Sequence, residues 1–255
     1  MVEGVLTELT SQFWLVAAVF LRLGPAFFLA PGYGEGYVSA RVRLVVALCF
    51  AAATAPVLEP HLPDVAPTGS NLFWYVLRET TLGTFIGLVS RGMIYLLEKA
   101  GAIISQSISL SQMLGNATEP MPVVSHILTT TGIAILYSTT LADQMLYTFV
   151  AGYSLSMPSM SNIAGFLAAK VSNLINYIFN QAVVLASGFL SLMFVYYLFI
   201  GFVNKAMPQF MVSFIGIPFV ALFSIHFLYQ HHDMLLSIWQ EKAKAILMMP
   251  YNSER

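Results

Sequence analysis

The sequence predicts an all-α protein that is inserted in a membrane or bound to one. Two observations support this prediction. Hydrophobic residues make up 58% of the 255 residues and charged residues only 9%, whereas about 25% of the residues of an ordinary soluble domain are charged. The hydrophobic residues also gather into long apolar segments, and about 20 such residues in a row allow a helix to cross a bilayer.

Seven apolar segments follow one another, and we expect five to seven of them to reach across a membrane. They are residues 13–30, 44–58, 72–97, 123–142, 145–168, 175–203 and 210–229. The segment 44–58 is short for a span, and the segment 72–97 contains Arg78, Glu79 and Arg91. Because a charge at the bilayer centre costs at least about 2.5–3.5 kcal/mol, some helices are expected to contact protein rather than lipid.

Short connectors rich in Pro, Gly and Ser separate these segments, which indicates tight loops rather than linkers. The whole chain, 1–255, is therefore predicted to be one domain. Gly83 and Gly87 have the spacing that lets helices pack closely, either within this chain or against another subunit. Residues 138–140 predict a helix break, after which Asp143 is expected to cap the next helix or to contact another subunit.

Composition and spacing exclude several functions. A formal net charge of −1 provides no positive electrostatic field that would attract nucleic acid. The single Cys49 is expected to be a small core residue. His231, His232 and Asp233 are adjacent, so one helix face cannot present all three to a metal, and a solvated helix end is predicted. No catalytic, metal or cofactor site is expected. A transporter would need an ionisable group deep in a helix, for which Asp143 is the nearest candidate.

Residues 104–124 form a polar, proline-containing stretch within this apolar chain. Ser and Gln side chains between Gly101 and Met113 leave no helical face wholly apolar, and Pro120 and Pro122 end the helix. Polar groups at membrane depth occur where they line a water-filled cavity or are buried in protein. From these residues alone, a pore lining or pore-closing loop and an ordinary water-exposed loop are both open interpretations.

Four motifs in a fixed order resemble the FliR family, the R subunit of the bacterial flagellar type III export gate, which is related to the injectisome SctT-type subunit. The motifs are "LRLGPAFFLAPGYGEGYVSARVRLVVAL", "ISLSQMLGNATEP", "LADQMLYTFVAGYSLSMP" and "GFVNKAMPQFMVSFIGIPF". Their most specific residues are Gly24, Pro25, Pro31, Arg41, Arg43, Lys205, Pro208 and Gln209. The family often has Arg at the position of Lys205. Lys keeps the positive charge but lacks the planar guanidinium that binds a partner through two parallel hydrogen bonds.

The resemblance implies a helical subunit in a closed-spiral hetero-oligomer, in which residues 1–170 are similar to the P subunit and residues 171–240 form a helical hairpin similar to the Q subunit. It implies contacts with FliP, FliQ, the switch protein FlhB, the gate protein FlhA and the basal-body ring. The expected location is the bacterial inner membrane within the flagellar basal body. Subunit contacts or structural roles are expected for the eight motif residues above and for Asp143.

The resemblance also implies a plug loop inside the export channel, in the region aligned with about 108–124. The implied plug residues are Ile108, Leu110, Met113, Leu114, Gly115, Asn116, Glu119, Pro120, Met121 and Pro122, and the polar approach to the pore is Ser105, Gln106, Ser109 and Gln112. The expected function is a non-enzymatic, channel-forming and channel-plugging subunit for the export of unfolded flagellar proteins. The alternatives are an injectisome gate subunit and a small-molecule or ion transporter.

Overall fold

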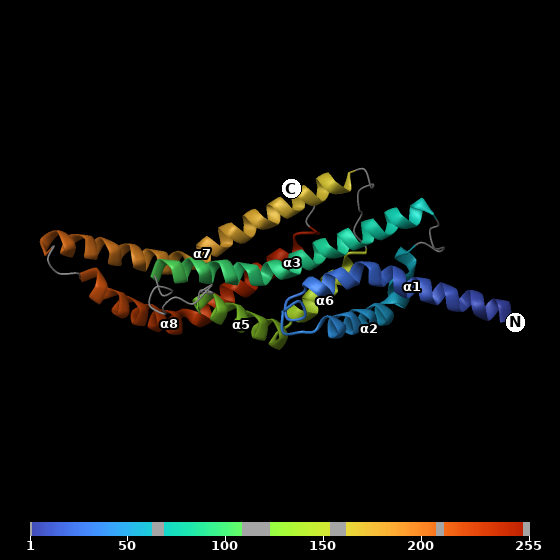
Figure 1. Cartoon of the computed structure of the whole chain (residues 1–255), viewed down its shortest axis with the longest axis horizontal. Helices are drawn as coiled ribbons and strands as arrows, with labels where there is room; N and C mark the ends of the chain where they lie inside the picture. Colours follow the sequence, from blue (N-terminus) through green and yellow to red (C-terminus); the bar gives the residue numbers. More distant parts are fainter. Residues whose placement is uncertain (1, 63–68, 109–122, 154–161, 208–211, 252–255) are drawn as a thin grey trace. The chain divides into compact units, whose positions relative to one another are not determined.

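The computed structural model describes residues 2–62, 69–108, 123–153, 162–207 and 212–251 (Figure 1). Within these ranges the chain is helical and forms no strand, which confirms the all-α fold. The described helices divide into two compact units that alternate along the sequence. The first comprises residues 1–92, 139–174 and 245–255, and the second comprises residues 93–138 and 175–244.

In the first unit, helix α1 (Val2–Leu29) packs along α2 (Ala40–Leu58). An aromatic cluster joins these helices to α6 (Leu141–Ala151), because the Phe27 ring lies 5.1 Å from that of Phe50 and 5.3 Å from that of Phe149, each edge to face. Such pairs stabilise a core by about 0.5–1.5 kcal/mol beyond their buried area. The cluster therefore connects three helices of this unit.

The connection between α1 and α2 is built from specific turn and capping groups. Gly32 has a φ of 84°, a left-handed conformation that glycine adopts without strain. The Ser39 hydroxyl accepts a hydrogen bond from the Val42 amide at 3.4 Å and caps α2. The Arg43 guanidinium donates to the carbonyls of Glu35 and Val38. Arg43 thus holds the loop in place from within α2.

The amino-terminal part of α3 (Ser70–Ile108) approaches α1 at two glycines. A Cβ atom at Gly83 would clash with the carbonyl oxygen of Arg22, and one at Gly87 would lie 3.0 Å from the Cα of Ala26. The structure therefore resolves the two interpretations of this glycine pair. In the first unit, Gly83 and Gly87 serve helix packing within the chain, as small residues do between membrane helices.

The second unit contains the rest of α3, α5 (Val123–Ser138), most of α7 (Ile163–Ala206) and most of α8 (Val212–Met248). Trp239 of α8 is fully buried, and its Nε1 donates to the Met93 carbonyl of α3 at 2.8 Å. A Cβ at Gly132 of α5 would clash with Leu97. The three helices are consequently packed at close range around Trp239.

The structure corrects several expected boundaries. The segment 145–168 is not one helix, because α6 ends at Ala151 and α7 begins at Ile163. The segment 44–58 belongs to an apolar stretch of 22 residues, Ala40–His61, which is long enough to span.

Cys49 is exposed rather than part of the core. The break at residues 138–140 is confirmed, and the division into P-like and Q-like parts stays a prediction.

Four of the described helical stretches are long and apolar enough to cross a membrane: Leu9–Leu29, Ala40–His61, Ser70–Ser107 and Ile163–Ala206. Two of them exceed what a bilayer requires. At about 1.5 Å per residue, the 39 residues of α3 and the 44 residues of α7 measure about 58 and 66 Å, whereas the hydrocarbon core is about 30 Å thick. A straight α3 or α7 therefore extends well beyond the hydrocarbon.

Candidate functional site

The predicted plug lies between α3 and α5. Ile108 is the last residue of α3 and Val123 the first of α5. Most of the predicted plug and approach residues fall between these two helices and lie outside the described residues: Ser109, Leu110, Gln112, Met113, Leu114, Gly115, Asn116, Glu119, Pro120, Met121 and Pro122. Of the polar approach, the structure describes Ser105, which is buried, and Gln106, which is exposed.

Two hydroxyl groups join the end of α3 to the start of α5. The Ser105 hydroxyl accepts a hydrogen bond from the Val124 amide at 3.3 Å, and the Ser125 hydroxyl donates to the Glu98 carbonyl at 2.8 Å. The helices also touch at Gly101, where a Cβ would clash with Ser125. These contacts fix the spacing of the two chain ends that flank the predicted plug. The role of Ser105 in the polar approach to the pore stays a prediction, and no local sequence pattern indicates this capping contact.

A buried ion pair lies in the first unit. The Arg22 guanidinium of α1 contacts the Glu79 carboxylate of α3 through two nitrogens, Nε and Nη2, each at 2.7 Å from Oε2, and both side chains are under 10% exposed, at 7% and 4%. Arg22 Nη1 also donates to the Gly152 carbonyl at 2.9 Å, and the guanidinium lies 4.0 Å from the centre of the Tyr153 ring. Every charged group in this cluster is thus paired.

Tyr153 completes the cluster through its hydroxyl, which donates to the Val19 carbonyl of α1 at 3.0 Å. Burial raises the pKa of Tyr153 above its ordinary value, so the hydroxyl remains protonated and able to donate at physiological pH. Tyr251 adds a similar bond to the Thr148 carbonyl at 2.6 Å. The sequence signal for this cluster was the charge of Arg22 and of Glu79 within apolar segments, but spacing alone did not identify the pair.

The motif residues of the amino-terminal part are placed by the structure as follows. Gly24 and Pro25 lie inside α1, where Pro25 removes one helical hydrogen bond, and Pro31 follows the helix end. Arg41 is exposed at the start of α2. Arg43 is the member with a clear structural role, because its guanidinium binds backbone carbonyls of the preceding loop.

The remaining predicted residues are spread over other elements. Asp143 lies in the first turn of α6 and is not its N-cap, which is Thr140, so the expected capping is wrong. Its side chain is exposed, and its negative charge suits the positive end of the helix dipole. Lys205 lies in the last turn of α7 and is exposed. Pro208 and Gln209 lie outside the described residues. The described motif residues do not converge on one site.

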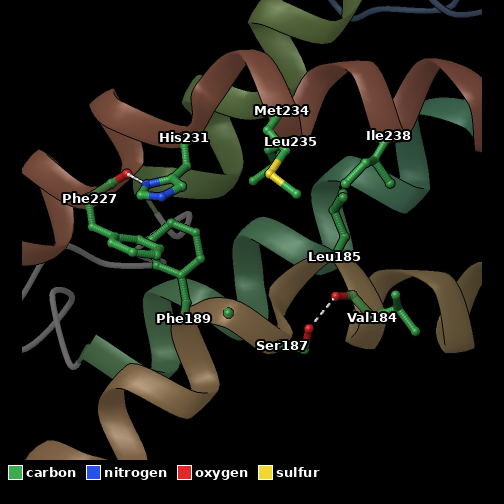
Figure 2. A pocket seen from close by; sticks show the side chains of 10 residues that line it. Val184, Leu185, Ser187, Phe189, Phe227, His231, Met234, Leu235 and Ile238 are labelled. Atoms are coloured by element: carbon green, nitrogen blue, oxygen red, sulfur yellow. Dashed lines mark hydrogen bonds between the residues drawn. The ribbon is translucent and has the colours of Figure 1, made fainter.

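The second unit contains an apolar pocket of about 290 Å³ between α7 and α8 (Figure 2). His231 stacks on Phe227 with ring centres 4.1 Å apart, and its Nδ1 lies 3.0 Å from the Phe227 carbonyl. Figure 2 shows the other labelled side chains to be mostly aliphatic or aromatic. His231 and its neighbours lie within α8, so the prediction that they form a solvated helix end is wrong about the helix end. In the described ranges, no three His, Cys, Asp or Glu side chains gather to hold a metal.

Large apolar side chains are exposed on the described surface of α7. Phe179, Phe194, Phe199 and Phe202 are each more than 60% exposed. Extended exposed apolar surface on a protein marks contact with another protein or with lipid. The long apolar helices and the buried polar groups that serve packing define a helical membrane protein. Its exposed aromatic side chains are suited to contact with lipid or with another protein.

Residues 13–246 match the family described as bacterial export proteins, family 1. The chain belongs to this family, which confirms the FliR-family resemblance carried by the motifs. It is also similar to the flagellar biosynthetic protein FliR of Caulobacter vibrioides. The two are 26% identical over 243 residues, which cover 92% of this chain and 95% of the relative.

Proposed function

We propose that this chain is a non-enzymatic, channel-forming subunit of the flagellar type III protein export gate in the bacterial inner membrane. The observation that carries the proposal is the match to a bacterial export family over residues 13–246, together with similarity along almost the full length of a flagellar biosynthetic protein. Long apolar helices with exposed aromatic side chains support it, because a subunit enclosed by other subunits needs such surfaces.

The proposed partners are FliP and FliQ within a closed spiral, FlhB and FlhA as further contacts, the basal-body ring, and unfolded flagellar proteins as cargo. The hairpin of residues 171–240 would take the place of a Q-like subunit, and residues 1–170 that of a P-like subunit. The lengths of α3 and α7 support an assembly that extends beyond the hydrocarbon. An injectisome gate would use the same architecture, and the similarity to a flagellar protein favours the flagellar system.

A transporter has less support. Its coupling carboxylate would have to be buried, and Asp143, the candidate from the sequence, is exposed in this chain. The described carboxylate that is buried, Glu79, forms a close ion pair with Arg22. The Glu79 carboxylate therefore serves a contact between α1 and α3 within the fold.

The first test is the native mass of the complex that a carboxy-terminally tagged copy brings out of its host membrane in mild detergent. We expect a large hetero-oligomer with one copy of this chain and several copies of P-type and Q-type subunits. A monomer or a homo-oligomer, obtained under conditions that preserve other membrane complexes, would contradict the proposed gate and favour a transporter.

We further propose that residues 108–124 close the channel at rest. The support is chemical: this stretch combines polar side chains suited to a wet lumen with Met113 and Met121, whose flexible side chains can fill an irregular seal. The Ser105–Val124 and Ser125–Glu98 hydrogen bonds support a loop anchored at both ends, so that a short segment could seal the channel and yield to substrate.

Deletion of Gly115–Pro122 is expected to raise ion leakage across the inner membrane, because the seal loses its central residues. Leakage is measured as dissipation of an imposed potassium gradient in cells or in vesicles that contain the complex. Deletion of Asp64–Pro67, in a different connector, is the control and should leave leakage at the background level. If the Gly115–Pro122 deletion assembles normally and leaks no more than the control, this segment does not plug the channel.

A further inference from the structure

Three polar groups of α1 and α3 are buried without a hydrogen-bond partner among the described residues. Arg78 Nε, the Tyr75 hydroxyl and Trp14 Nε1 are buried and make no hydrogen bond in the described part of the chain. The Trp14 and Tyr75 rings contact each other with centres 5.7 Å apart. Tyr75 and Arg78 are three residues apart on α3 and therefore share a helix face. Arg78 Nε and Trp14 Nε1 can only donate hydrogen bonds, and the Tyr75 hydroxyl can donate as well. What these three groups lack is therefore a hydrogen-bond acceptor.

Among the described residues, Arg78 also lacks a counter-charge. Arg22 and Glu79 neutralise each other. Arg78, the neighbour of Glu79 in sequence, takes part in none of the ion pairs formed by the described residues. The Arg78 side chain is only partly exposed. An arginine held in apolar surroundings without a counter-charge is costly, and such residues in membrane helices are normally paired.

The surface around Arg78 shows what kind of partner would supply that charge. Trp74, one helical turn before Arg78, is 52% exposed, and Leu77 is 40% exposed. Phe73 and, on α1, Phe13 are also exposed. A partner that covers these side chains must itself be mostly apolar. A lipid phosphate lies at the polar interface rather than among apolar side chains, so a carboxylate carried by an apolar helix fits better.

We propose that Arg78 is the docking point for a partner subunit, which places one Asp or Glu side chain of an apolar helix against the Arg78 guanidinium and packs over Trp74 and Leu77. The planar fork of arginine binds a carboxylate through two parallel hydrogen bonds. The partner carboxylate also offers an acceptor to Tyr75. This inference rests on the proposed function, since it needs a hetero-oligomer.

The test compares the hetero-oligomer recovered with tagged Arg78→Gln, Arg78→Lys and wild-type chains. We expect Arg78→Gln to reduce the recovered partner subunits more than about tenfold, because it leaves the partner carboxylate buried without a counter-charge. Arg78→Lys keeps the charge and should retain a larger share. Lys99→Gln removes one positive charge from the same helix, where Lys99 forms only an exposed pair with Glu98, and should recover wild-type amounts.

Selection for restored motility in an Arg78→Glu strain identifies the partner residue. We expect suppressors that change an Asp or Glu of another gate subunit to Lys or Arg. Wild-type amounts of complex with Arg78→Gln, or suppressors confined to this chain, would overturn the proposal. So would an unchanged subunit composition accompanied by loss of a bound phospholipid in native mass spectrometry, because Arg78 would then hold a lipid phosphate.

A third measurement uses the wild-type Arg78 and is therefore independent of how its variants fold. A photo-crosslinking amino acid at the exposed position Trp74 should join this chain to a partner helix with an Asp or Glu within about one turn of the joined residue. Crosslinks to lipid alone would overturn the inference. If the wild-type chain yields no hetero-oligomer at all, the proposed function fails. A normal wild-type complex that tolerates Arg78→Gln leaves that function intact and removes only this inference.

Discussion

Replacement of Arg22 by alanine is expected to lower the free energy of unfolding by about 3–5 kcal/mol, because it leaves the Glu79 carboxylate buried without a counter-charge. The pair is close, at 2.7 Å, and both side chains are under 10% exposed, so solvent screens it little. The same change removes the bond to the Gly152 carbonyl and the contact with Tyr153. The measurement is the unfolding equilibrium of the purified chain in detergent, followed by helical circular dichroism.

Two variants separate the ion pair from simple packing. The double variant Arg22→Met with Glu79→Leu removes both charges and keeps most of the volume, so it should be markedly more stable than Arg22→Ala. Lys99→Ala removes an exposed ion pair and is expected to cost less than about 1 kcal/mol. If Arg22→Ala costs no more than Lys99→Ala, the buried pair does not stabilise the chain as its geometry indicates.

Replacement of Gly83 by alanine is expected to cost about 1–3 kcal/mol or more, because one methyl group must enter a contact that has no space. The new Cβ would clash with the Arg22 carbonyl oxygen and lie 2.8 Å from the carbonyl carbon. These are backbone atoms, so relief requires α1 and α3 to move apart. Such a movement would also strain the Arg22–Glu79 pair, which joins the same two helices.

Gly188→Ala is the matched control for Gly83→Ala. Gly188 lies in α7, and a Cβ there would meet open space. Alanine favours a helix over glycine by about 0.5–1 kcal/mol, so this variant should be as stable as the wild type or slightly more stable. Equal stability of Gly83→Ala and Gly188→Ala would show that the close approach of α1 to α3 is not required. Both variants are compared by the same unfolding measurement.

The apolar pattern of the sequence predicted the helices well but several of their ends poorly. The helix break before Leu141 follows from local residue types, and the spacing of Gly83 and Gly87 predicted close packing. The polar end of α3 was harder to assign, because hydropathy falls there while the helix continues to Ile108. The Ser107 hydroxyl bonds to the Ile104 carbonyl within that helix. A serine hydroxyl that bonds back to a carbonyl of the preceding turn has its polar group satisfied inside the helix, so a helix can accommodate such a residue although its hydropathy is low.

At the candidate site, too, some features could be predicted from the sequence and others depend on the folded structure. The polar composition of residues 104–124 marked a place unsuited to lipid, and motif order identified the family, because both properties belong to the chain itself. The capping of α5 by Ser105 depends on a residue 19 positions away, which no local pattern encodes. The chemistry of Ser105 left a water-filled cavity and burial in protein both open, and the packed helices bury it.

The sequence by itself determined that this is an all-α membrane protein of an export family and that charges such as Arg78 and Glu79 need partners. Those conclusions require only composition, order and the cost of burying a charge. Only the tertiary structure decided which charges are paired. Arg22 reaches Glu79 across 57 residues, while Arg78, adjacent to Glu79 in the chain, finds no ion-pair partner among the described residues. Pairing depends on how α1 and α3 approach each other, because Coulomb attraction acts through distance in space and not along the sequence.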